Sequence, residues 1–290
     1  MQTTVRSASK TVTINTGGPV VIIGEKINPT GHKKMAAALL QGDFDYIREL
    51  ARRQVQYGAD ILDVNVGAAG VDDVALMPQV VRVVAEVSDA PLCLDSPNPA
   101  ALAAGLATVT GKALVNSVSG EEARLQAVLP LVKDHQAAVI GLTMDDNGIP
   151  SDVEGRVAIA EKILERAARL GIPAEDVVID PLVMTVGADS KAGLVTLRTI
   201  ELIQQNLGVN INLGASNVSF GLPDRPTVNA TFMAIAISRG ASCVISDPMK
   251  MTGIVRSADL LLGRDEYAMR YIRYFRALPK DESQLKSSKT

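Results

Sequence analysis

Carboxylate and carboxamide side chains recur at the ends of short apolar segments throughout this chain. In chain order the clearest cases are Glu25, Asn28, Asp63, Asn65, Asp95, Asn116, Asp145, Asp180, Asn217 and Asp247. Carboxylates accept hydrogen bonds, whereas carboxamides both donate and accept them, so this set suits a neutral, flat heterocycle that presents N–H groups and a carbonyl. A phosphorylated ligand would favour a cluster of lysines and arginines or a glycine-rich nest at a helix N-terminus, and neither accompanies these residues.

Some of these polar residues have a purely structural interpretation, because Asp, Asn and Ser are favoured as helix N-caps and in turns. We assign that role to Asn28, Ser96, Asn98 and Asp152. Asp95, Asn116 and Asp180 are assigned to a binding site instead. Each of the three ends an apolar run, where an unpaired polar group would cost about 1 to 3 kcal/mol.

Metal binding and thiol chemistry have little support in the sequence. His32 and His135 are the only two histidines, so a zinc-type cluster is not expected, and we predict no metal site. Cys93 and Cys243 each lie inside an apolar run without a second cysteine nearby. We therefore expect two buried, free thiols and no disulfide.

The elements that must position the polar residues alternate regularly between short β-branched runs and longer amphipathic stretches. We expect strands at 20–27, 61–66, 91–94, 113–118, 138–144, 177–182, 209–213 and 242–246. Helical patterns follow them, most clearly at 44–57, 152–170, 226–239 and 258–275. Eight parallel βα units in one α/β domain predict a closed (β/α)8 TIM barrel, whose functional side chains gather at the C-terminal ends of the strands. A doubly wound open sheet is the alternative, but no GxGxxG motif follows a strand.

The chain of 290 residues is 47% hydrophobic, enough for one large core. We expect a single barrel domain over 20–278, preceded by an N-terminal extension at 1–19 that could form a hairpin at the barrel bottom, and followed by a polar tail at 279–290. The formal charge of −3 and an aromatic content of 3% argue against a nucleic-acid surface. Without an apolar run of about 18 residues, the chain is expected to be soluble and cytoplasmic, with no membrane partner.

Several motifs, one for each expected strand, resemble those of the pterin-binding methyltransferase family. They are Gly24-Glu25-Lys26-Ile27-Asn28, Asp63-Val64-Asn65-Val66-Gly67, Cys93-Leu94-Asp95-Ser96, Asn116-Ser117, Gly141-Leu142-Thr143-Met144, Ile179-Asp180-Pro181-Leu182 and Ser216-Asn217-Val218-Ser219. The resemblance covers about 20–275. This family includes methyltetrahydrofolate:corrinoid methyltransferases and the folate domain of cobalamin-dependent methionine synthase, and it has the barrel fold.

The resemblance implies roles for individual residues. Asp95, Asn116 and Asp180 would hold the pyrimidine edge of the pterin, and Asn217 would lie near N5, the nitrogen that carries the methyl group. In the catalytic step Asn217, with Asp180, would support the change of charge at N5. The remaining candidates for the pterin site are Met144 as an apolar wall, and Ser216 and Arg225 in the loop of Asn217. Phe220 stands where some family members carry a polar residue, so no hydrogen bond is assigned to that position.

The implied reaction moves a methyl group between N5 of methyltetrahydrofolate and the cobalt of a corrinoid (cobalamin). The resemblance implies that a separate corrinoid protein carries this group and docks on the open end of the barrel, and that the enzyme is a homodimer. Two alternatives stay open. One is an enzyme similar to dihydropteroate synthase, although of its cationic pattern only Lys250 is found in 247–252. The other is a non-catalytic pterin-binding subunit of a methyl-transfer complex.

Overall fold

The computed structural model describes residues 1–279, and its centre is a curved parallel sheet of seven strands in the order β8-β7-β6-β5-β4-β3-β9. The strands are β3 (Val21–Ile27), β4 (Ile61–Val64), β5 (Leu92–Asp95), β6 (Leu114–Ser119), β7 (Ala138–Leu142), β8 (Val177–Asp180) and β9 (Cys243–Ser246). The α/β class and parallel arrangement predicted from the sequence are therefore confirmed, as are seven of the eight expected strands. Of the polar tail expected at 279–290, only Pro279 lies within the described residues.

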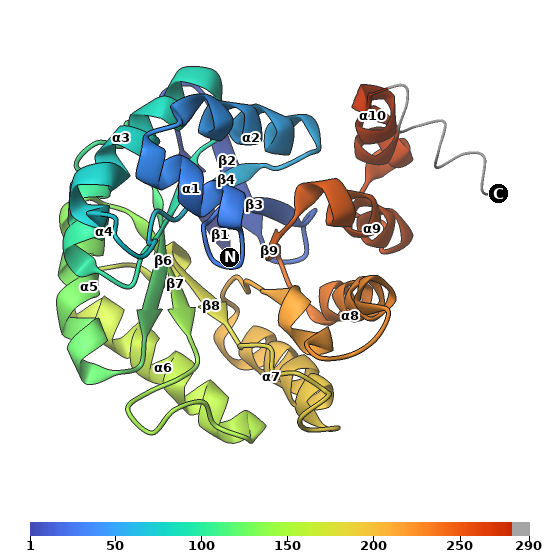
Figure 1. Ribbon diagram of the computed structural model, residues 1–290. Helices are drawn as coiled ribbons and strands as arrows, with labels where there is room; N and C mark the ends of the chain where they lie inside the picture. Colours follow the sequence, from blue (N-terminus) through green and yellow to red (C-terminus); the bar gives the residue numbers. More distant parts are fainter. Residues whose placement is uncertain (280–290) are drawn as a thin grey trace.

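The helices lie around the outside of the strands and follow one another around the sheet in chain order (Figure 1). They are α1 (Lys33–Gln41), α2 (Phe44–Gln56), α3 (Asp73–Val87), α4 (Pro99–Leu106), α5 (Glu122–Asp134), α6 (Val153–Arg169), α7 (Ala192–Leu207), α8 (Arg225–Arg239), α9 (Pro248–Leu261) and α10 (Met269–Ala277). Three short 3₁₀ helices, η1 (Ala174–Asp176), η2 (Ala215–Ser219) and η3 (Glu266–Ala268), complete the set. Among residues 1–279 no helix has both the length and the apolar composition to cross a membrane.

The strand expected at 209–213 is not formed as a regular strand, so this prediction is wrong. Ile211 makes one parallel bridge, to Ile179 of β8. Its carbonyl accepts the backbone N–H of Cys243 in β9 at 3.0 Å, but its own N–H donates to the hydroxyl of Ser242 at 2.9 Å. Because a side chain takes this N–H, no reciprocal ladder with β9 develops, although the segment is hydrogen-bonded to β8 on one side and to β9 on the other.

The inner and outer faces of the sheet carry separate apolar layers, as the alternation of side chains along each strand requires. Residues such as Leu62, Leu94 and Val139 belong to the large core between the strands and the helices. The alternate residues form a second cluster on the inner face. Its members on the main sheet are Val21, Ile23, Ile61, Cys93, Leu114, Ala138, Ile140, Val178 and Cys243. The two cysteines are buried and free, as predicted.

An antiparallel hairpin of β1 (Gln2–Arg6) and β2 (Thr11–Asn15) packs its apolar side chains against this inner cluster. Arg6 exchanges two backbone hydrogen bonds with Lys112, which lies just before β6, at 2.8 and 2.9 Å. Asn210 donates through its side chain to the Thr3 hydroxyl at 2.9 Å and to the Ile14 carbonyl at 3.0 Å. The hairpin therefore fills the N-terminal end of the space that the strands surround.

The capping and turn roles predicted for four polar residues are confirmed. Asp152 accepts the N–H of Gly155 at the start of α6, and Asn98 accepts that of Ala100 at the start of α4. Ser96 and Asn28 each accept the N–H of the residue two positions later. These side chains satisfy backbone donors that would otherwise lack a partner at helix and turn starts.

The helix expected at 258–275 is interrupted, which corrects that prediction. Gly263 has a φ of +71°, a left-handed conformation that ends α9, and α10 begins only at Met269. The carboxylate of Asp265 accepts the backbone N–H groups of Arg270 and Tyr271 at 2.9 and 2.8 Å, so it caps the start of α10. The helical periodicity of the sequence runs through this break and does not reveal it.

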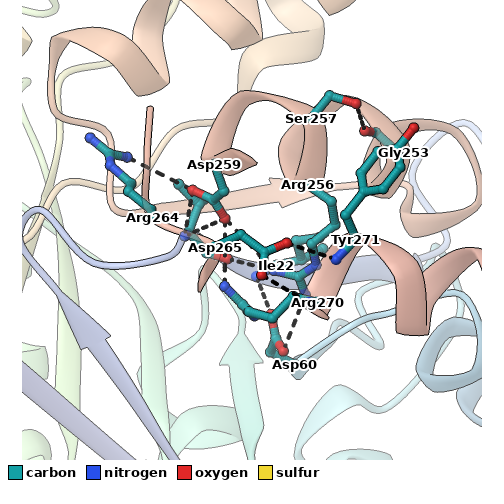
Figure 2. A network of polar contacts seen from close by, with 11 residues as sticks. Ile22, Asp60, Gly253, Arg256, Ser257, Asp259, Arg264, Asp265, Arg270 and Tyr271 are labelled. Carbon is teal, nitrogen blue, oxygen red and sulfur yellow. Dashed lines mark hydrogen bonds and ion pairs between the residues drawn. The ribbon is translucent and has the colours of Figure 1, made fainter. Parts of the chain in front are cut away.

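A buried ionic network ties α9 and α10 to the start of β3 (Figure 2). Asp259 of α9 accepts the backbone N–H of Val20 at 3.0 Å and lies within 4.0 Å of three arginines, Arg256, Arg264 and Arg270. Burial raises the pKa of Asp259 to about 6, while the Val20 N–H and the arginines act in the opposite direction. The carboxylate is therefore charged at pH 7 and paired, and it fastens the last helices to the first strand of the sheet.

Candidate functional site

A polar layer lies directly above the inner apolar cluster, towards the C-terminal ends of the strands. On five of the seven strands a polar residue comes two positions after an inward-facing apolar one, so both point to the same side. This relation holds for Ile23 and Glu25, Ile61 and Asp63, Cys93 and Asp95, Leu114 and Asn116, and Val178 and Asp180. The predicted site residues Asp95, Asn116 and Asp180 thus lie at the same end of the sheet, where parallel βα folds carry their binding sites.

Asp95 and Asn116 are directly opposite each other in the register of β5 and β6. Asn65 donates through Nδ2 to Oδ2 of Asp95 at 2.9 Å. Burial raises the pKa of Asp95, and the bond from Asn65 and the charge of Arg124 oppose that shift. Arg124 of α5 donates to the backbone carbonyls of Ser96 and Ser117, each at 2.8 Å, so one guanidinium holds together the two loops that follow these strands.

Asp63 lies beneath this pair and is 1% exposed. Asn116 donates through Nδ2 to Oδ1 of Asp63 at 3.3 Å. Burial and the charge of Asp95 raise the pKa of Asp63 well above its usual value, against hydrogen bonds from Cys93 and Asn116. Two carboxyl groups that share a buried site cannot both ionise freely, so the pair favours a state in which one proton is retained.

Asp180 ends β8 and is 6% exposed. Its Oδ1 accepts the backbone N–H of Leu182 at 2.9 Å, and its Oδ2 accepts Nδ2 of Asn212 at 2.7 Å. Burial raises its pKa to about 6, while these two bonds and the charge of Arg156 hold the shift down. Arg156 of α6 donates to the carbonyls of Pro181 and Leu182 at 2.9 and 2.8 Å and so fixes the turn after the strand.

The structure places the other predicted residues outside this hydrogen-bonded layer. Ser216 and Asn217 are exposed on η2, and among residues 1–279 the Asn217 side chain has no hydrogen-bond partner. Arg225 at the start of α8 donates to the Ser219 hydroxyl at 3.1 Å and to the Ser216 carbonyl at 2.8 Å. Its guanidinium therefore shapes the loop that presents Asn217.

Met144 follows β7 by two residues and is half-buried. Its backbone carbonyl accepts the N–H of Gly120 at 2.7 Å, which joins the loops after β6 and β7. This bond fixes the backbone of Met144, and its thioether side chain is of the flexible, apolar kind that adapts to a neighbouring surface.

Charged residues gather on one side of the layer, at the ends of β3 and β9. Asp247 lies 3.6 Å from Nζ of Lys26 and 3.9 Å from Nζ of Lys250. Burial and the nearby Asp247 raise the pKa of Glu25, and the two lysines oppose this shift. Lys26, which the sequence places far from Lys250, is a second cation here.

The strand patterns place Asp63 and Asn65 among the polar residues at the strand ends but give neither a role in holding the pterin, and they miss Asn212 altogether. The available signal is the spacing of two residues from an inward-facing apolar side chain. Asn212 lies in a segment, Val-Asn-Ile-Asn-Leu at 209–213, whose alternation is typical of an ordinary strand. Within residues 1–279 no group of three or more His, Cys, Asp or Glu side chains is arranged to hold a metal ion.

The fold and this layer define the class of protein: a parallel α/β enzyme whose strand ends carry buried carboxylates and carboxamides. Residues 24–247 match the model of the family described as pterin binding enzyme. The chain belongs to this family, and the resemblance inferred from the strand-end motifs is confirmed.

Individual relatives agree with this assignment. The chain is 33% identical over 265 residues to a methylcorrinoid:tetrahydrofolate methyltransferase of Eubacterium limosum, a match that covers 89% of this chain and 96% of that protein. It is 33% identical over 227 residues to the methionine synthase of Mycobacterium tuberculosis, covering 74% of this chain but only 19% of that protein. Among solved structures, a dihydropteroate synthase of Xanthomonas albilineans superposes with a TM-score of 0.68 at 20% identity, over 90% of this chain and 98% of that one. The last comparison shows a shared fold.

Proposed function

We propose that this protein is a methyltransferase that moves a methyl group between N5 of methyltetrahydrofolate and the cobalt of a corrinoid carried by a partner protein. The observation that carries the proposal is the placement of Asp95, Asn116 and Asp180 at one end of the sheet, on strands β5, β6 and β8. The similarity to a methylcorrinoid:tetrahydrofolate methyltransferase over nearly the whole of both chains supports it.

The pterin ring presents an amino group, a ring N–H and a carbonyl on its pyrimidine edge. Asp180 and Asp95 supply acceptors for the N–H groups, and the carboxamide of Asn116 supplies a donor for the carbonyl. These residues are held in place before any ligand arrives. Asn65 and Asn212 donate hydrogen bonds to Asp95 and Asp180, and Arg124 and Arg156 bind the loops that follow the strands. A preorganised site loses less entropy on binding than a flexible one.

The methylated nitrogen needs a separate polar group. An amine leaves poorly, so methyl transfer from N5 requires proton donation or a strong hydrogen bond as the C–N bond breaks. We assign this role to Asn217, assisted by Asp180, with Met144 as an apolar wall and Ser216 and Arg225 as supports of the Asn217 loop. The exposure of Asn217 is compatible with this role, because its carboxamide is free to turn towards a bound ligand.

The proposal includes the form of the molecule and its partners. The domain of 20–278 would act as a closed (β/α)8 barrel, with 1–19 closing one end, and the hydrogen bonds from 209–213 to β8 and β9 support this closure. The corrinoid supplies the cobalt that accepts or donates the methyl group. We also propose that the protein is a homodimer in the cytoplasm and has no membrane or nucleic-acid partner.

The first test is an anaerobic mixture of the purified protein with methyltetrahydrofolate and Co(I) cobalamin, followed by visible spectroscopy. We expect protein-dependent loss of the Co(I) spectrum and appearance of methylcobalamin. Binding of methyltetrahydrofolate without turnover, also when a corrinoid protein is supplied, would favour a binding subunit. Condensation of a pterin pyrophosphate with an aromatic amine would instead assign the chain to dihydropteroate synthase chemistry, and absence of any pterin binding would refute the site.

A further inference from the structure

Asn212 occupies a position that the fold itself does not require to be polar. It is fully buried in segment 209–213, which lies between β8 and β9 in space. Its backbone N–H already donates to the Ile179 carbonyl at 2.9 Å, and the neighbouring carbonyls of Ile211 and Leu213 accept N–H groups of β9. The carboxamide is thus not needed to satisfy the backbone, yet burying it without partners would be costly. Its partners must explain its presence.

Within the described residues the carboxamide has two partners, and both belong to the inner face. Nδ2 donates to Oδ2 of Asp180 at 2.7 Å, and the thiol of Cys243 donates to Oδ1 of Asn212 at 3.5 Å. A carboxylate can only accept, so the NH₂ group must face Asp180, and the thiol stabilises the same orientation from the other side. Cys243, Asn212 and Asp180 form a chain of hydrogen bonds that ends at the site.

The bond from Asn212 also determines what Asp180 can still do. Each carboxylate oxygen offers two acceptor positions, and the Leu182 N–H and Asn212 occupy one on each oxygen. One position stays free on both oxygens, which is the arrangement that two parallel N–H donors of a heterocycle edge require. Both partners of Asp180 are neutral. The other charged or titratable groups that face it are Arg156 from α6, which donates to backbone carbonyls, and the Cys243 thiol from β9.

We propose that Asn212 is a positioning residue: its amide holds the Asp180 carboxylate ionised and oriented towards the pterin, and Cys243 fixes the direction in which that amide faces. The inference rests on the proposed function, because it assigns Asp180 to the pterin edge. It adds a residue on a segment that contributes no other group to the site.

The test compares Asn212→Leu with the matched control Asn210→Leu. Both changes remove a fully buried carboxamide from the same segment, but Asn210 bonds the hairpin at the opposite end. In the ligand-free protein the Asp180 carboxyl is titrated by ¹³C NMR. We expect its midpoint to move upwards by about one to two pH units in Asn212→Leu, because a hydrogen bond to the charged form is lost, and to stay unchanged in Asn210→Leu. Binding of methyltetrahydrofolate at pH 7 should weaken about two- to tenfold in Asn212→Leu only.

A second variant, Asn212→Asp, distinguishes positioning from simple packing. The introduced carboxyl would share a proton with Asp180 and keep the hydrogen bond while that proton is held, so binding should persist near pH 6 and fail as the pH rises. This alkaline loss is absent in wild type and opposite in direction to the acid-side loss of Asn212→Leu. An unchanged Asp180 titration in a folded Asn212→Leu would refute the inference, whatever its binding. Failure of the wild type to bind methyltetrahydrofolate would instead refute the proposed function, and the titration would still decide whether Asn212 controls Asp180.

Discussion

Asn116 on β6 reaches across β5 to donate a hydrogen bond of 3.3 Å to Asp63 on β4. In a flat sheet two strands separated by a third lie about 10 Å apart, too far for such short side chains to meet. The contact forms because the sheet curves around its inner face. The curvature therefore has a chemical effect, since it brings carboxyl and carboxamide groups from separate strands into one connected layer.

Replacing Asp95 by Ala should remove an acceptor for the pterin edge and leave Nδ2 of Asn65 without its acceptor. We expect the affinity for methyltetrahydrofolate, measured by calorimetry, to fall by a factor of about 10 to 100, as for a lost charge-assisted hydrogen bond. Asp72→Ala is the control, because Asp72 only caps α3. It should lower stability by about 1 kcal/mol and leave binding unchanged. Equal affinities of the two variants would contradict the role of Asp95.

Because of Asp180, the affinity for methyltetrahydrofolate should decrease at acidic pH. With a pKa of about 6 in the folded protein, the carboxylate that accepts N–H donors is lost as the pH falls through 6, so affinity should decline there. The Asp180→Asn variant should bind methyltetrahydrofolate weakly at every pH and should not show this pH dependence. The same raised pKa makes the folded protein hold the proton on Asp180 more tightly than the unfolded chain does, so the stability of wild type relative to Asp180→Asn should decrease as the pH rises from about 4 to 6. Urea denaturation at several pH values measures this trend.

Asn217→Ala should slow methyl transfer more than it weakens binding. A group that assists N5 only while the C–N bond breaks contributes to the transition state and little to the bound ground state. We expect the single-turnover rate with Co(I) cobalamin to fall at least about tenfold, with the affinity for methyltetrahydrofolate within about twofold of wild type. An unchanged rate would show that another group serves N5.

Gly111 should be intolerant of substitution. Its φ is +118°, and a Cβ there would lie 2.2 Å from the backbone oxygen of Arg6 in the hairpin. Gly17, with a φ of +77° and no atom within 4 Å of the place that a Cβ would occupy, is a control for a positive φ without a clash. Gly17→Ala should cost about 1 kcal/mol and Gly111→Ala several times more, because the hairpin must shift. Chemical denaturation of both variants tests whether the clash or the strain dominates.

Local sequence signals predicted the regular parts of this molecule well. Apolar runs bounded by turn residues predicted seven strands. The polar residues that end three of these runs, Asp95, Asn116 and Asp180, were the candidates for the site. These signals work because an inward-facing side chain and the one two residues later share an environment. The N-caps Asn98 and Asp152 were equally local and equally predictable.

What escaped prediction depends on contacts between distant segments. The N–H of Ile211 is taken by Ser242, 31 residues away, and is therefore not available for a ladder with β9. The role of Asn212 depends on its hydrogen bonds with Asp180 and Cys243, which lie on other strands. Lys26 likewise meets Asp247 only because β3 and β9 are neighbours. Periodicity in one segment carries no information about such partners.

The hairpin at the N-terminal end has a kinetic consequence for the proposed reaction. Since its side chains fill the space within the strands from below, the folate and the corrinoid protein must both approach from the C-terminal end. A docked protein would cover the polar layer, so the smaller substrate has to arrive first and depart last. Steady-state kinetics should then follow a compulsory order through a ternary complex. Excess partner protein should bind the folate complex and inhibit the reaction uncompetitively with respect to folate.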